Sequence, residues 1–172
     1  MSAVVNIELA IEPERPQDVA DALALVERAF GPGRYAKAAE RLREGNHPVP
    51  ELSFVARNGR AVTGSVRLWP IRIGERPALL LGPIAVERSE RSRGLGAALV
   101  ERACAAAAEA GHELVVLVGD LGFFARMGFE RLPGGQVRLP GPADPSRILV
   151  KALKPGALDG LEGEAALPRR TA

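Results

Sequence analysis

The segment Arg91-Ser-Arg-Gly-Leu-Gly96 has the residue types of a phosphate-binding turn. It follows a strongly apolar run and opens an alanine-rich stretch, which places it at the start of a predicted helix. Backbone N–H groups at a helix N-terminus lack partners and the helix dipole is positive there, so both favour an anion. Gly94 and Gly96 leave the backbone open to close approach, and Arg91 and Arg93 add positive charge. These residues predict a diphosphate site built mainly from backbone donors.

The spacing of this turn excludes two commoner phosphate loops. A Walker A loop needs a lysine after its last glycine, and none follows Gly96. The dinucleotide fingerprint needs a third glycine where this chain has Leu99. The remaining pattern, Arg-x-x-Gly-x-Gly, is short, so glycines that merely permit a tight strand-to-helix turn are the alternative explanation.

The elements around the turn predict a mixed α/β sheet rather than a doubly wound one, because hairpin-paired strands precede a strand–helix–strand unit. Residues 1–154 form one predicted domain, and residues 155–172 a loosely ordered tail. Periodicity and turn residues predict strands at 4–11, 52–56, 61–73, 78–86, 113–119, 129–132 and 148–153, and helices at 17–30, 35–44, 94–111 and 120–127. Asn58-Gly59 marks a hairpin.

Gly82-Pro83 interrupts the most apolar strand, 78–86. Proline cannot donate to a strand ladder, and so apolar a strand is not expected at a sheet edge. We therefore predict a β-bulge at this dipeptide, with local loss of pairing to a neighbouring strand.

Two segments resemble the GCN5-related N-acetyltransferase (GNAT) superfamily. Residues 81–100 are similar to its motif A, Gln/Arg-x-x-Gly-x-Gly/Ala, and residues 115–129 resemble the next strand and the helix with the pattern Tyr-x-x-x-Gly-Phe. The combination of Leu-Gly-Pro-Ile-Ala-Val, Val-Gly-Asp and a late Leu-Pro-Gly-Pro loop is similar to the YhbS-like branch. The resemblance implies the GNAT fold: a central, mostly antiparallel sheet with one splayed parallel strand pair, flanked by helices.

The resemblance also implies an activity, the transfer of an acetyl group from acetyl-CoA to an amine by direct attack in a ternary complex. Pantetheine would bind backbone groups of Ile84, Ala85 and Val86, and the N–H of Val86 would polarise the thioester carbonyl. The implied diphosphate site comprises Arg91, Ser92, Arg93, Gly94, Leu95, Gly96 and Ala97. Phe124 would contact the pantetheine or the acyl group; for the pair Phe123-Phe124, a place in the hydrophobic core is the alternative.

The family's usual acid is missing. A tyrosine on the short helix often protonates the leaving sulfur in this family, but its position is Phe124 here. The single tyrosine, Tyr35, lies before the first hairpin. Two alternatives follow: an enzyme that uses water as the acid, or an acyl-CoA-binding sensor with a degenerate active site. A protein that keeps only the fold as an interaction module is a third.

Candidates for a general base are few. Glu87 follows the central strand and is the first of them; Glu51, His47 and Asp120 are the others. A solvated charge or a helix cap is the favoured explanation for each carboxylate, and a solvent-facing position is the favoured one for His47. No cluster of His, Cys, Asp and Glu has metal-ligand spacing, so we expect no metal.

Composition limits the remaining function classes. The 172 residues carry a net charge of +2, with arginines spread along the chain, so nucleic acid is not an expected partner. No apolar run approaches the roughly 20 residues needed to span a bilayer, so a membrane is not expected either. The one cysteine, Cys104, permits no internal disulfide, and a cytoplasmic location is expected. By the resemblance, residues 30–50 and 133–147 would contact the acceptor, a small-molecule or peptide amine of open identity. A homodimer is one oligomeric state that the sequence leaves open.

Overall fold

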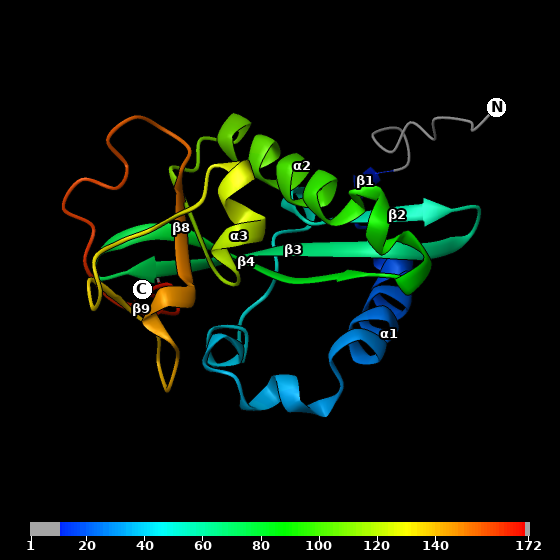
Figure 1. The fold of residues 1–172 in the computed structure, drawn as a ribbon, viewed down its shortest axis with the longest axis horizontal. Helices are drawn as coiled ribbons and strands as arrows, with labels where there is room; N and C mark the ends of the chain where they lie inside the picture. Colours follow the sequence, from blue (N-terminus) through cyan, green and yellow to red (C-terminus); the bar gives the residue numbers. More distant parts are fainter. Residues whose placement is uncertain (1–10, 171–172) are drawn as a thin grey trace.

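The computed structural model describes residues 11–170, in which strands pair into one sheet carrying helices on both faces (Figure 1). The strands are β1 (Ile11–Pro13), β2 (Phe54–Asn58), β3 (Ala61–Ile73), β4 (Arg76–Val86), β5 (Leu114–Val118), β6 (Glu130–Arg131), β7 (Val137–Arg138), β8 (Ile148–Ala152) and β9 (Gly163–Ala166). The α-helices are α1 (Val19–Phe30), α2 (Leu95–Glu109) and α3 (Leu121–Phe124). Short 3₁₀ turns are η2 (Pro16–Asp18), η3 (Pro32–Ala36), η4 (Ala38–Leu42), η5 (Pro50–Leu52), η6 (Arg88–Arg93), η7 (Ala125–Met127) and η8 (Pro145–Arg147).

The sheet has the order β1-β2-β3-β4-β5-β8-β6, with β9 beside β3 and β7 beside β9. Its pairs are antiparallel except β4–β5 and the short β7–β9 pair. This confirms the mixed, mostly antiparallel sheet with a parallel pair at its centre. The β2–β3 hairpin is also confirmed, with Asn58 paired to Ala61.

The predicted bulge in β4 is confirmed. Val66 of β3 pairs with Ile84, whereas Leu68 pairs with Leu81, so Gly82 and Pro83 together oppose one residue. The peptide between these two residues is cis. On the other side, β4 pairs with β5 only at Leu79 and Leu80, before the bulge. Beyond the bulge the two parallel strands separate, which opens the centre of the sheet.

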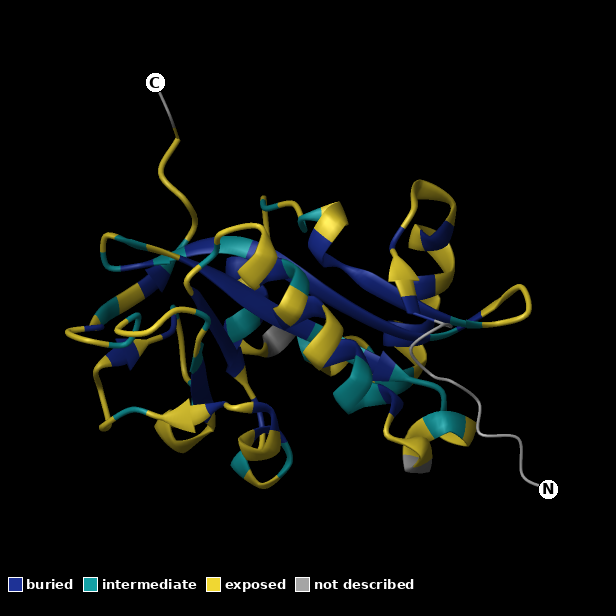
Figure 2. Cartoon of the chain, turned by 90° about the horizontal axis from the view of Figure 1, so that it is seen from above, coloured by how far each residue is buried: buried dark blue, intermediate teal, exposed yellow. Residues whose placement is uncertain are grey.

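Helices cover the sheet because its central strands are apolar on both faces (Figure 2). The buried side of α2 packs on one face, against β3 and β4 residues such as Leu68 and Leu79. Its alanines and Cys104 are small, which allows the helix to lie close to the strands. On the opposite face, Leu25 and Val26 of α1 pack near Ala85 of β4. The open centre of the sheet is therefore walled by helical segments on both sides.

Three expectations differ from the structure. The segment 35–44 forms η3 and η4 rather than one helix, because Lys37 between them is extended, with φ −77° and ψ 144°. The segment 155–172 is not a loose tail where it is described: β9 pairs with β3 and Ala165 is buried. The predicted strand 4–11 lies outside the described residues except for Ile11, which opens β1.

Candidate active site

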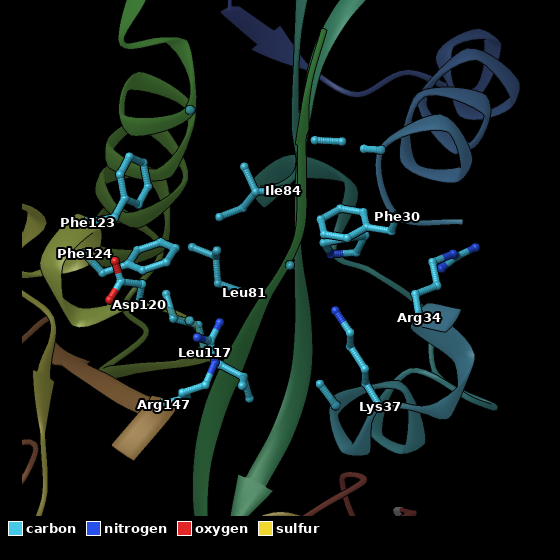
Figure 3. A pocket seen from close by; sticks show the side chains of 18 of the residues that line it. Phe30, Arg34, Lys37, Leu81, Ile84, Leu117, Asp120, Phe123, Phe124 and Arg147 are labelled. Atoms are coloured by element: carbon cyan, nitrogen blue, oxygen red, sulfur yellow. The ribbon is translucent and has the colours of Figure 1, made fainter. Parts of the chain in front are cut away.

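A cavity of about 790 Å³ occupies the opening beside the bulged part of β4 (Figure 3). One wall comes from β5, α3 and the start of α2. The opposite wall comes from the end of α1 with η3 and η4, and the loop 139–147 closes a third side. Figure 3 shows Phe123, Phe124 and Leu117 on one side of β4 and Phe30, Arg34 and Lys37 on the other. The cavity therefore reaches both faces of the sheet at the point where β4 and β5 separate.

The edge of β4 toward the cavity presents backbone groups that β5 does not pair with. Glu87 N–H donates to Thr63 O of β3 at 2.8 Å, and successive residues of a strand point their N–H groups to opposite edges. The N–H and C=O of Val86 therefore point away from β3. The Nε of Arg91 donates to Val86 O at 3.2 Å, which agrees with this direction. Ile84 has the same orientation by alternation, and β5 no longer pairs with β4 here.

The start of α2 presents a second set of backbone donors. Its first intrahelical bond runs from Ala98 N–H to Gly94 O at 3.0 Å, so the N–H groups of residues 95–97 have no acceptor within the helix. No side chain caps this terminus in the described structure. Gly94 has φ +75°, and a Cβ built there would meet nothing within 4 Å. A Cβ on Gly96 would lie 3.7 Å from Phe123 and 3.8 Å from Val86. The turn is therefore open to an anion.

Most of the sequence-predicted site residues meet at this cavity, as its lining residues include Ile84, Ala85, Val86, Arg91, Gly94, Gly96, Ala97 and Phe124. Three predicted residues of the turn do not line it. The Leu95 side chain is buried in the core, exposed Arg93 lies 3.7 Å from Glu90, and Ser92 lies within η6. The predicted role of these residues depends on their backbone rather than on their side chains.

The four candidates for a general base differ in whether they line the cavity. Glu87 forms an ion pair with Arg28 of α1 and does not line the cavity. Neither Glu51 nor His47 lines it. Asp120 does, and its carboxylate also accepts a hydrogen bond from Gly122 N–H at 3.3 Å, as expected for the cap of α3. Of the four candidates, Asp120 is the one positioned to exchange a proton with a group in the cavity.

Phe124 gives the cavity an apolar lining beside Asp120. Its ring is 8% exposed and packs edge-on against Phe123 and Phe129, with centroid distances of 4.8 and 5.7 Å. A Cβ on Gly119 would lie 2.4 Å from the Phe124 ring, so a glycine is required where β5 ends. The ring is apolar and offers no proton.

Several lining residues were not identified from sequence. Arg34, Lys37, Arg43, Asp144 and Arg147 all contribute to the cavity. They lie within the ranges 30–50 and 133–147 that the family resemblance assigns to acceptor contact. No periodic pattern distinguishes them individually, because they lie on or beside short 3₁₀ turns and in a loop.

The described residues contain no group of three or more His, Cys, Asp or Glu side chains that could hold a metal ion. Within 11–170, no helix is both long and apolar enough to span a bilayer.

The chain resembles known acetyltransferases in both sequence and structure. Residues 50–131 match the model of the acetyltransferase (GNAT) domain family. The uncharacterized N-acetyltransferase YhbS of Escherichia coli K12 is 29% identical over 157 residues, covering 90% of this chain and 93% of that protein. The crystal structure of E. coli YhbS in complex with CoA superimposes with a TM-score of 0.78 at 28% identity, covering 92% and 88% of the two chains. A GNAT family acetyltransferase from Brucella melitensis in complex with acetyl-CoA gives 0.67 at 28% identity, covering 92% and 94%.

Proposed function

Because residues 50–131 match the acetyltransferase (GNAT) domain family and nearly the whole chain resembles E. coli YhbS, we propose that this chain is a GNAT acetyltransferase. It would transfer an acetyl group from acetyl-CoA to an amine by direct attack in a ternary complex. One observation carries the proposal. A single cavity extends from the uncapped amides at the start of α2 to the free edge of β4 at Val86, through the gap between β4 and β5.

Each part of acetyl-CoA has a chemically suitable partner along this cavity. Its diphosphate would bind the N–H groups of residues 95–97, with Arg91 beside them. The pantetheine is an extended chain with two amides, which suits the free edge of β4 at Ile84 and Val86. Apolar side chains such as Phe124 would enclose the acyl end. The complexes of E. coli YhbS with CoA and of the B. melitensis relative with acetyl-CoA support this choice of ligand.

The reaction needs a donor to the thioester oxygen, an acceptor for the proton of the amine, and a proton source for the leaving sulfur. The Val86 N–H would donate to the thioester oxygen as that oxygen gains negative charge. The neutral amine attacks the carbonyl carbon, so that a C–N bond forms as the C–S bond breaks. The amine nitrogen then loses a proton to Asp120 or to water. The CoA sulfur leaves as a thiolate and takes a proton from water, because Phe124 has none to give.

The sensor hypothesis keeps one supporting observation, the absence of a hydroxyl at Phe124. It predicts tight acyl-CoA binding without turnover. General acid catalysis contributes about 10²–10⁴-fold in enzymes that use it, so its absence slows transfer without abolishing it. We therefore favour the enzyme.

The test is a thiol-release assay with acetyl-CoA and a broad panel of amines, beside a calorimetric titration with acetyl-CoA. The proposal predicts saturable binding and thiol release that depends on an amine. Binding with no release across the panel would favour the sensor. Absence of binding at millimolar acetyl-CoA would refute both.

A further inference from the structure

We propose that the acceptor is an amine that also bears an oxyanion, a carboxylate or a phosphate, bound by Arg43 and Lys37 on the α1 side of the cavity. This inference rests on the proposed acetyl transfer and specifies its second substrate. It excludes polyamines and other amines that carry only positive charge.

The cavity is unbalanced in charge. Its described lining contains five basic and two acidic side chains, namely Arg34, Lys37, Arg43, Arg91 and Arg147 against Asp120 and Asp144. Arg91 lies at the predicted diphosphate turn. Pantetheine and the acetyl group are uncharged, so acetyl-CoA provides no partner for basic groups at the acyl end. An acceptor that is itself a cation would meet repulsion there.

Arg43 lies at the reaction end of the cavity. A Cβ on Gly82 would be 2.9 Å from its Nη2, so the guanidinium is packed against the β4 bulge. Trp69 Nε1 donates to Gly82 O at 2.6 Å and holds the same bulge from within the core. Because Gly82 has no side chain, the Arg43 guanidinium can approach the strand that would carry the thioester.

The Arg43 guanidinium has donors to spare. Its Nη1 donates to the Glu40 carboxylate at 3.1 Å, and its buried Nε has no partner in the described structure. Burial lowers the pKa of Arg43 from its ordinary value, while the bond to Glu40 opposes this. Arg34 also approaches Glu40, at 3.9 Å, so this carboxylate is shared between two cations. Arg34 is also paired with Glu27, at 2.7 Å, so these two arginines are balanced by two carboxylates, and the excess positive charge on this wall comes from Lys37.

Lys37 adds a second cation on the same wall. It forms no ion pair with any described residue, and its Nζ lies 5.5 Å from the centroid of the Phe30 ring. In Figure 3 the Lys37 side chain extends toward β4, whereas Arg34 turns toward α1, where it binds Glu27 at 2.7 Å. A carboxylate or phosphate between Arg43 and Lys37 would leave the amine of the same molecule free to point toward β4.

The experiment compares matched amines in the thiol-release assay. α-Amino acids are paired with their decarboxylated amines, and phosphoethanolamine with ethanolamine. We expect kcat/KM to favour the anionic member by about tenfold or more, the size of a hydrogen bond to a charged group. The amino-acid and phosphoethanolamine arms identify which oxyanion is bound. Equal or faster reaction of the partners that lack the oxyanion would overturn the inference.

Variants locate the effect. Lys37→Gln removes an exposed charge, so we expect a loss of about two- to fivefold for the anionic amine and none for its partner. Arg43→Lys keeps the charge that Glu40 needs but loses the planar donor set, and should cost roughly tenfold. Arg60→Gln, in the β2–β3 turn away from the cavity, is the matched control. Equal losses for both members of a pair in Lys37→Gln and Arg43→Lys would also overturn the inference.

Acetyl-CoA affinity, measured in the same variants, keeps the two proposals apart. Binding and turnover without preference for anionic amines would remove the inference and leave the acetyltransferase. If no amine reacts, N-acetylated amino acids and N-acetylated phosphoethanolamine are titrated into the protein with CoA bound. Binding that weakens in Arg43→Lys would support the oxyanion site, and failure of every product to bind would overturn it.

Discussion

The clearest consequence of the uncapped helix start concerns Gly94. We compare Gly94→Asp with Gly94→Asn, two substitutions of equal size that differ by one negative charge. Gly94 has φ +75° and open space around its missing Cβ, so each variant pays backbone strain of about 1 kcal/mol without a clash. The Asp variant should be no less stable than the Asn variant, because a negative charge at a helix N-terminus is favourable by about 0.3–1 kcal/mol.

Acetyl-CoA, by contrast, should bind the Asp variant much more weakly than the Asn variant. A diphosphate on the amides of residues 95–97 would place its oxygens within contact of a side chain at position 94. Two like charges about 4 Å apart cost about 4 kcal/mol at an effective dielectric constant of about 20, which is roughly a thousandfold in Kd. Gly94→Asn should lose far less. Calorimetry measures Kd, and thermal unfolding without ligand measures stability. Equal acetyl-CoA affinity in the two variants would refute the placement of the diphosphate.

Three further predictions follow from particular side chains. Phe124→Tyr should raise kcat by about tenfold to a hundredfold without changing acetyl-CoA affinity, because it supplies the missing acid; an unchanged rate would mean that sulfur protonation does not limit turnover. Burial raises the pKa of Asp18, but hydrogen bonds from Arg57 and from the N–H of Arg15 outweigh it, so the net pKa lies below the ordinary value. The Asp18 carboxylate therefore stabilises the fold above the ordinary carboxyl pKa, and this stabilisation is lost as pH falls through the lowered pKa. In urea unfolding at pH 7, Asp18→Asn should lower the free energy of unfolding by about 2 kcal/mol, and the difference from wild type should narrow in acid. A difference in free energy that does not change with pH would contradict this. Burial raises the pKa of Cys104 to about 11, so a thiol reagent at pH 8 should label the native protein far more slowly than the unfolded chain, and rapid native labelling would show that α2 is not packed as described.

The strand and helix pattern was predictable where one physical signal dominated. The thirteen residues of β3 matched their predicted bounds, because turn residues flank the segment, Asn58-Gly59 before it and Gly74 after it. The bulge was predictable because Gly82-Pro83 conflicts with an otherwise buried strand. The prediction of one helix over residues 35–44 was wrong. Lys37 lies within the helical spacing but takes an extended conformation, which divides the segment into two 3₁₀ turns.

The sequence predicted those parts of the site in which backbone groups would bind the ligand. Glycines, a strand end and a helix start identify the diphosphate turn and the free edge at Val86. Glu87 illustrates the limit: its position after β4 suggested a base, yet α1 supplies Arg28 to pair with it. Contacts between distant segments decide such roles. The same holds for Arg43, which reaches Gly82 only because η4 folds over the bulge.

A crystal structure of this protein with acetyl-CoA bound tests the central claim most directly. We expect diphosphate oxygens within about 3 Å of the N–H groups of residues 95–97, and the thioester oxygen facing Val86 N–H. A diphosphate bound elsewhere, with those amides facing only solvent and the gap between β4 and β5 empty, would contradict the account.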